Sequence, residues 1–293
     1  NNDCNNILVA LDGANSTPAD YRRVLDALLD RKPGVLAQDV GSPDPVLFRS
    51  QVATSFGKHL VEVSRQVWQE DVQETMAIRQ RDLLEVLHQA GTDPLALTVE
   101  ACRSRGVRVV ASFRMNAEDW YDKTYLLSDF GRAHPEWRLR RPDGHLSGNL
   151  DPAVPQVYDH RMRIFAEVAA EYDIDGIEFD FRRWYHMVSE PLRNHGVLTR
   201  MVRDTRRMLD ETARRKGRGR LILGARVGPS LDAEPSPYLF PGIFYPSKPV
   251  NASCRELGLD IRTWVDEGLV DYLCPSLFLA SLPGMPLTRE FAE

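Results

Sequence analysis

Short apolar stretches alternate with long helical patterns along this chain. Six stretches have the length and composition of strands, at residues 7–11, 35–40, 107–115, 176–181, 221–227 and 272–278. Helical patterns separate them, and strands joined through helices run parallel, with the helices covering the sheet. The alternation therefore predicts an α/β fold.

The connections between these elements are uneven in length. Long loops follow the second, third and fifth strands, at about residues 41–94, 116–154 and 228–256, whereas the turns from helix to strand are short. Loops enlarged only at the C-terminal ends of strands are typical of a (β/α)8 TIM barrel, whose site lies on that face. A doubly wound sheet is the alternative, but Asp12-Gly13-Ala14-Asn15 after the first strand is not a GxGxxG fingerprint.

The length of 293 residues suits one barrel, and no linker or repeat divides it. We therefore expect a single catalytic domain over residues 1–293. The long loops take up much of this length, and we find six strands where a barrel has eight. We expect strands seven and eight to be missing from this sequence, and the barrel to belong to a longer chain or to be completed by other segments.

Composition excludes several classes of partner. The net charge of -5 gives no reason to expect a nucleic acid. No apolar run approaches the length of a membrane-spanning helix, so we expect no membrane partner. The four cysteines form no CxxC pair, and neither HxH nor HExxH occurs, so we expect no cofactor and no metal centre. The oligomeric state is left open.

The fourth strand carries the strongest chemical signal. Side chains alternate along a strand, so Glu178, Asp180 and Arg182 share one face, opposite the apolar side chains of the same strand. The two carboxylates are separated by roughly 7 Å between α-carbons, and like charges this close favour one protonated and one ionised carboxyl group. We predict that Asp180 and Glu178 are catalytic. The alternative is an internal ion pair with Arg182 or Arg114 that only closes the barrel.

Other strand ends and loops supply further polar and aromatic side chains. Arginines suit anionic groups, and loop aromatics such as Trp184 can stack on sugar rings. Three arginines lie on or at the ends of predicted strands: Arg114, Arg182 and Arg226. They would either bind an anionic substrate or neutralise the carboxylates. The candidate substrate-binding residues are Asp12, Arg114, Asn116, His134, Arg182, Arg183, Trp184, Arg226 and Ser276.

Several segments together resemble a known family. The stretch Asp173-Ile-Asp-Gly-Ile-Glu-Phe-Asp-Phe-Arg182 resembles the strand-four signature of glycoside-hydrolase-like TIM barrels. Residues 107–116, His134-Pro-Glu-Trp137 and residues 257–276 look like bacterial members described as family-10-like glycosyl hydrolases. Chitinase-type enzymes also share the strand-four pattern, but Arg182 stands where that family has its acid glutamate. This departure argues against chitinase-like chemistry.

The resemblance implies hydrolysis of glycosidic bonds in an oligo- or polysaccharide, with a carbohydrate as the partner. One group must protonate the leaving oxygen and another must assist attack at the anomeric carbon. We expect Asp180 to be the general acid/base and Glu178 its partner, with Asp12 as the alternative second carboxylate. Two other functions stay open: a non-catalytic carbohydrate-binding barrel, and a lyase or esterase acting on acidic sugars.

Overall fold

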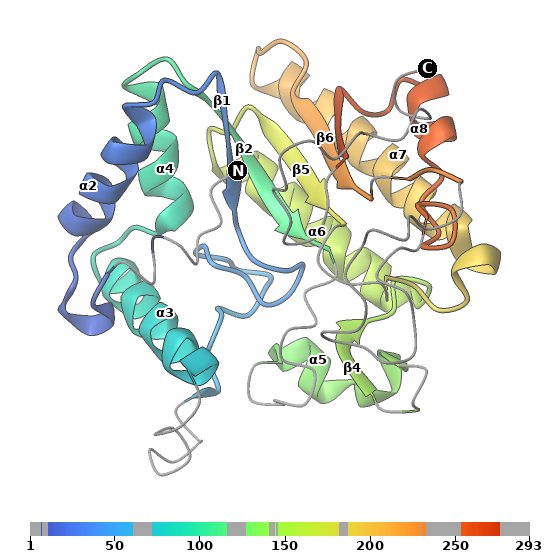
Figure 1. The fold of residues 1–293 in the computed structure, drawn as a ribbon, viewed down its shortest axis with the longest axis horizontal. Coiled ribbons are helices and arrows are strands. Elements are labelled where there is room, and N and C mark those ends of the chain that lie inside the picture. The colour runs from blue at the N-terminus through green and yellow to red at the C-terminus, as the bar shows by residue number, and fades with distance from the viewer. Residues whose placement is uncertain are drawn as a thin grey trace.

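A parallel sheet lies at the centre of the computed structural model (Figure 1). Its strands pair in the order β1 (Val35–Asp39), β2 (Arg108–Arg114), β5 (Gly176–Asp180), β6 (Ile222–Val227) and β7 (Tyr272–Pro275), and every pairing is parallel. The structure describes residues 7, 11–60, 72–115, 127–140, 144, 146–181, 187–228, 230–232 and 253–275.

The order of the strands follows the order of the chain, as in consecutive βα units of a barrel. Among the described strands the sheet is open at β1 and β7, and the predicted α/β class with a parallel sheet is confirmed. Five of the six predicted strands are present. The prediction over residues 7–11 is not supported where it can be checked, because Ile7 is helical and Leu11 lies in a bend. Residues 8–10 lie outside the described part.

Helices cover the sheet, and capping side chains start several of them. Thr17 and Asp20 form a capping box, while Asp93 and Asp260 accept N-terminal backbone N–H groups of their helices. No helix among the described residues is long and apolar enough to cross a membrane. The longer helices are α2 (Pro18–Leu29), α3 (Val72–Gln89), α4 (Pro94–Arg103), α6 (Pro155–Glu171), α7 (Pro191–Arg215) and α8 (Ile261–Asp266).

The loop predicted between the third and fourth strands has regular structure in its described part. It contains α5 (Asp129–Ala133), the 3-10 turn η4 (Pro135–Trp137) and an antiparallel hairpin of β3 (Arg138–Arg140) and β4 (Leu146–Leu150). These strands are too short for a repeating pattern, which is why the sequence does not reveal them. Residues of β4 line the same pocket as Asp39 of β1 and Arg114 of β2, although they are far apart in the sequence.

Aromatic packing fixes which face of the sheet meets the helices. Phe113 of β2 and Phe179 of β5 both contact Phe165 of α6, with ring centroids 4.9 Å apart in each pair. Phe181 contacts the fully buried Trp264 of α8. The odd-numbered side chains of β5 therefore point toward the helices, as predicted, and Glu178 and Asp180 point to the opposite face.

Candidate active site

Polar side chains form two rows across the face of the sheet that turns away from the helices. Strand partners in a parallel sheet place their side chains on the same face, so the pairing register defines each row. The first row contains Asp39, Ser112, Glu178, Gly224 and Tyr272. The second row, one step nearer the C-terminal ends of the strands, contains Arg114, Asp180, Arg226 and Cys274.

Glu178 is held from both sides of its own strand. Its Oε1 accepts a hydrogen bond of 2.7 Å from the Ser112 hydroxyl, and its Oε2 accepts one of 2.6 Å from the Tyr272 hydroxyl. The Glu178 residue is only 4% exposed. A buried carboxylate is costly without such donors, and the two hydroxyls also fix the orientation of its plane.

Tyr272 reaches Glu178 by crossing an intervening strand. Its phenol ring passes over Gly224 of β6, where a Cβ atom would overlap the ring. Burial and the charge of Glu178 both raise the pKa of Tyr272 far above its usual range. The phenol therefore keeps its proton and remains a donor to the carboxylate.

On the expectation from the sequence that Glu178 assists glycan cleavage, replacing Tyr272 by phenylalanine should lower kcat for that reaction by about tenfold to a hundredfold, because a hydrogen bond to a charged group contributes about 1.5–3 kcal/mol. Steady-state kinetics would measure this loss. The control is Tyr158→Phe, which removes a comparable hydroxyl bonded to Asp204 at 2.7 Å on the helical side. An equal loss in both variants would contradict a role for Tyr272 in positioning Glu178.

A second measurement tests whether the Tyr272 hydroxyl keeps its proton. Tyrosine ordinarily ionises near pH 10, whereas the raised pKa of Tyr272 keeps it neutral above that range. Tyrosinate absorbance at about pH 11 should therefore be equal in the wild type and in Tyr272→Phe. A smaller absorbance in the variant would mean that Tyr272 ionises normally.

Asp180 lies between two arginines in the second row. Arg226 Nη1 is 3.4 Å from Asp180 Oδ2, and Arg114 is the strand partner of Asp180 on the other side. Arg114 Nε also lies 3.0 Å from Oδ2 of Asp39, at the end of β1. Asp39 and Asp180 are each 4% exposed. The row therefore alternates positive and negative groups, which compensates the cost of burying them.

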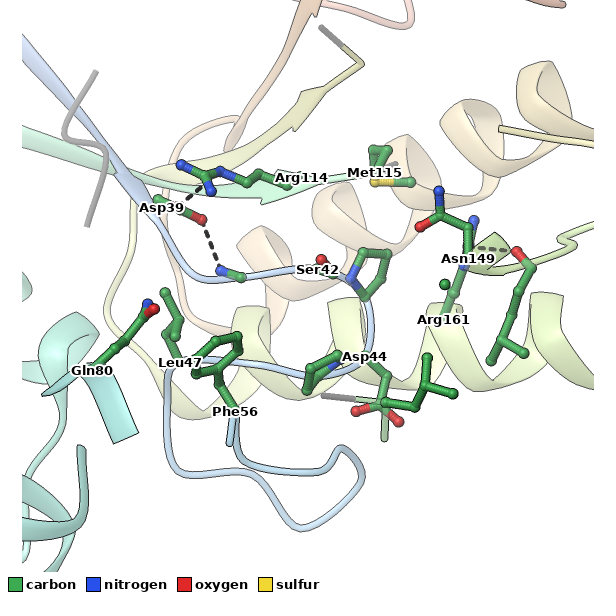
Figure 2. A pocket seen from close by; sticks show the side chains of 16 residues that line it. Asp39, Ser42, Asp44, Leu47, Phe56, Gln80, Arg114, Met115, Asn149 and Arg161 are labelled. Carbon is green, nitrogen blue, oxygen red and sulfur yellow. Dashed lines mark hydrogen bonds and ion pairs between the residues drawn. The ribbon is translucent and has the colours of Figure 1, made fainter. Parts of the chain in front are cut away.

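A pocket adjoins this charged row at the ends of β1 and β2 (Figure 2). Asp39 and Arg114 form one wall, and the segment after β1 that includes Asp44 forms another. Asn149 of β4 and Arg161 of α6 line the side formed by the hairpin and the helix. Of the residues in the two rows, Asp39 and Arg114 line this pocket, whereas Glu178 and Asp180 are not among its lining residues.

Two of the predicted substrate-binding residues have local contacts instead. Asp12 is exposed, and its carboxylate accepts a hydrogen bond of 3.0 Å from Asn15. His134 stacks on Trp137 with ring centroids 3.6 Å apart, and its Nδ1 is 3.0 Å from Glu136. Neither is brought to the two rows by these contacts. Five predicted residues lie outside the described part of the chain: Asn116, Arg182, Arg183, Trp184 and Ser276.

Three residues of the site were not candidates from the sequence. Asp39 is the residue before the last in a predicted strand, and a carboxylate near a strand end was a usable signal. Arg161 falls on the apolar stripe of α6, and a charged residue at an apolar position of a helical pattern was also a usable signal. Tyr272 begins a predicted strand, and nothing in its sequence neighbourhood indicates contact with Glu178. Within the described residues no group of three or more His, Cys, Asp or Glu side chains is placed to hold a metal ion.

The sequence of this chain matches a known protein family. The model of the family described as Glycosyl hydrolase-like 10 matches residues 60–216. The chain is also similar to "Glycosyl hydrolase DigH" of Escherichia coli (strain K12), with 24% identity over 216 residues that cover 64% of this chain and 46% of that protein. The chain thus spans about half the length of the curated relatives it matches.

Solved structures give weaker likenesses. A GH18 chitinase from Cycas revoluta, in complex with allosamidin, has a TM-score of 0.35 at 13% identity over 60% of this chain and 38% of that one. The maltogenic α-amylase AmyB from Thermotoga neapolitana has a TM-score of 0.39 at 15% identity over 72% and 41%. The family match covers more than half of the chain, and the chain therefore belongs to the Glycosyl hydrolase-like 10 family.

Proposed function

We propose that this chain is a glycoside hydrolase that cleaves O-glycosidic bonds of an oligo- or polysaccharide by carboxylate acid/base catalysis. The observation that carries the proposal is the pair Glu178 and Asp180, two buried carboxylates on one face at the C-terminal end of β5. Membership of a glycosyl hydrolase-like family supports a carbohydrate substrate. Two carboxylates are also what this hydrolysis requires.

The two carboxylates would have different tasks. Asp180 is nearer the strand end, so we assign it to protonate the leaving oxygen and later to accept a proton from water. Glu178 lies one step deeper and is fixed by Ser112 and Tyr272. Its oriented carboxylate would assist attack at the anomeric carbon as nucleophile or base.

The remaining predicted residues would bind substrate around this pair. Arg114 and Arg226 flank Asp180 and would contact hydroxyl or anionic groups of the sugar. Asp12 and His134, and the five candidates outside the described residues, stay as proposals for more distant contacts. On this proposal the chain forms a catalytic domain of barrel type.

A broad glycan panel tests the proposal. It should include neutral, uronic, sialylated and sulfated oligosaccharides, with new reducing ends and product masses as the readout. We expect cleavage of at least one class, and loss of that cleavage in Asp180→Asn and in Glu178→Gln. The proposal fails if no glycan is cut in a way that depends on either residue.

A non-catalytic carbohydrate-binding barrel is the second candidate. It is favoured by the engagement of both Glu178 oxygens and by the ion pair between Asp180 and Arg226, since such contacts also occur in purely structural networks. In that case a glycan from the panel would bind without cleavage. Its affinity would then survive both substitutions.

A further inference from the structure

The pocket beside Asp39 and Arg114 is lined by charged, polar and apolar residues. Its volume of about 100 Å³ is several times what a single ordered water molecule needs, so the pocket has room for a small ionised group. It opens next to Arg114, the strand partner of Asp180. A sugar placed at the proposed catalytic pair could therefore direct a substituent into it.

Arg161 stands where α6 should be apolar. The helix buries Val157, Ile164 and Val168 along one stripe, and Arg161 falls on the same stripe while lining the pocket. It is 4% exposed, and burial lowers its pKa to about 10, so it remains charged at neutral pH. A charged side chain at such a position is costly to keep.

The bonds of Arg161 leave part of its guanidinium unused within the described residues. Nη2 donates to the carbonyl oxygen of Leu150 at 2.8 Å, whereas the buried Nε has no hydrogen-bond partner. Asp151 is the nearby opposite charge, but its Oδ1 accepts the backbone N–H groups of Ala153 and Ser189. No ion pair within 4.0 Å joins Arg161 to a described carboxylate.

The two carboxylates of the pocket already have cationic or histidine partners. Asp39 pairs with Arg114 at 3.0 Å. Asp44 lies 3.0 Å from Nε2 of His160, and it also accepts the backbone N–H of Thr54 at 2.8 Å. Neither carboxylate compensates Arg161, so the pocket combines a buried guanidinium with room for an incoming anion.

We propose that this pocket is a subsite for an anionic substituent of the sugar, a carboxylate or a sulfate, held by Arg161. The inference rests on the proposed function, because it places the substituent on a sugar bound at Glu178 and Asp180. Oxyanions match the planar fork of a guanidinium, and such charge-assisted bonds are the strong ones in proteins. Asn149 lines the same pocket and would contact the same group.

Binding of small probes tests the subsite without any turnover. Glucuronate, its methyl ester, glucose and glucose 6-sulfate would be titrated into the wild-type chain by calorimetry or ligand-observed NMR. We expect glucuronate or the sulfate to bind at least about tenfold more tightly than the ester and glucose, since a charged hydrogen bond is lost in the neutral probes. Equal affinity of all four probes, or no binding, would overturn the proposal.

Two variants locate the effect. Arg161→Gln should abolish the preference for the charged probe, while Arg161→Lys should retain part of it. The matched control is Arg163→Gln, which removes an exposed arginine from the same helix and should keep the full preference. A preference that persists unchanged in Arg161→Gln would also overturn the proposal. The wild-type comparison of acid and ester holds even if a variant fails to fold.

The outcome is separable from that of the proposed function. If charged probes bind through Arg161 but no glycan is cleaved, the subsite stands and the hydrolase assignment falls. If glycans are cleaved through Asp180 while acid and ester bind equally, the hydrolase stands and the subsite falls. Asp180→Asn should retain the probe preference, because catalysis is not needed for it.

Discussion

Replacing Asp180 by asparagine should lower the rate of glycan cleavage by about a hundredfold to ten-thousandfold, the contribution of a positioned acid or base. Asparagine keeps the shape of the side chain and can still accept a hydrogen bond from Arg226, so the fold should persist. With a dinitrophenyl glycoside, whose leaving group needs no proton, the loss should shrink to about tenfold or less. Glu178→Gln should instead lose activity on both substrates.

A matched variant controls for the loss of an aspartate–arginine pair. Asp173 lies three residues before β5, at the N-terminal ends of the strands, and pairs with Arg218 at 2.9 Å. Asp173→Asn should therefore cleave at the wild-type rate. The assignment of Asp180 is wrong if Asp180→Asn keeps full activity, or if Asp173→Asn loses as much.

Replacing Gly176 by alanine should lower the free energy of unfolding by about 3 kcal/mol, the upper end for overpacking in a core. A Cβ atom at this position would overlap the carbonyl oxygen and side chain of Ile222 on the neighbouring strand. The obstacle includes backbone, so β5 and β6 would have to move apart. Urea unfolding should show a lower midpoint with an unchanged slope.

Gly34 supplies the control for this substitution. It lies directly before β1, much as Gly176 begins β5, but a Cβ there would meet no heavy atom within 4 Å. Gly34→Ala should therefore leave stability unchanged or slightly higher, because alanine restricts the unfolded chain. Equal destabilisation of both variants would show that the close approach of β5 and β6 is not the cause.

Local patterns predict much of this structure because they depend on neighbours in the sequence. The two faces of β5 follow from alternation, so the shared face of Glu178 and Asp180 was predictable. The starts of α2 and α4 follow from capping residues such as Thr17 and Asp93. Each of these features is decided within about one turn of helix or one strand.

The remaining parts of the site depend on contacts between distant elements. The bond from Tyr272 to Glu178 requires the register of β5, β6 and β7 and a glycine at position 224, none of which periodicity specifies. The pocket depends on a hairpin of short strands, β3 and β4, that brings Asn149 beside α6. Sequence reasoning places residues on faces, but register and short irregular elements decide which faces meet.

The strand order β1-β2-β5-β6-β7 allows the sheet to form strand by strand while the chain is being synthesised. In the described sheet each strand pairs with the sheet strand that comes just before it in the sequence and with the one that comes just after it. No strand is inserted between two strands that are already paired. Because the chain emerges from the ribosome N-terminus first, each new strand could pair with the edge strand of the sheet that has already formed. The Glu178 carboxylate would then receive its hydrogen bond from Ser112 on an earlier strand and the one from Tyr272 on a later strand, so its site is completed only when β7 is in place.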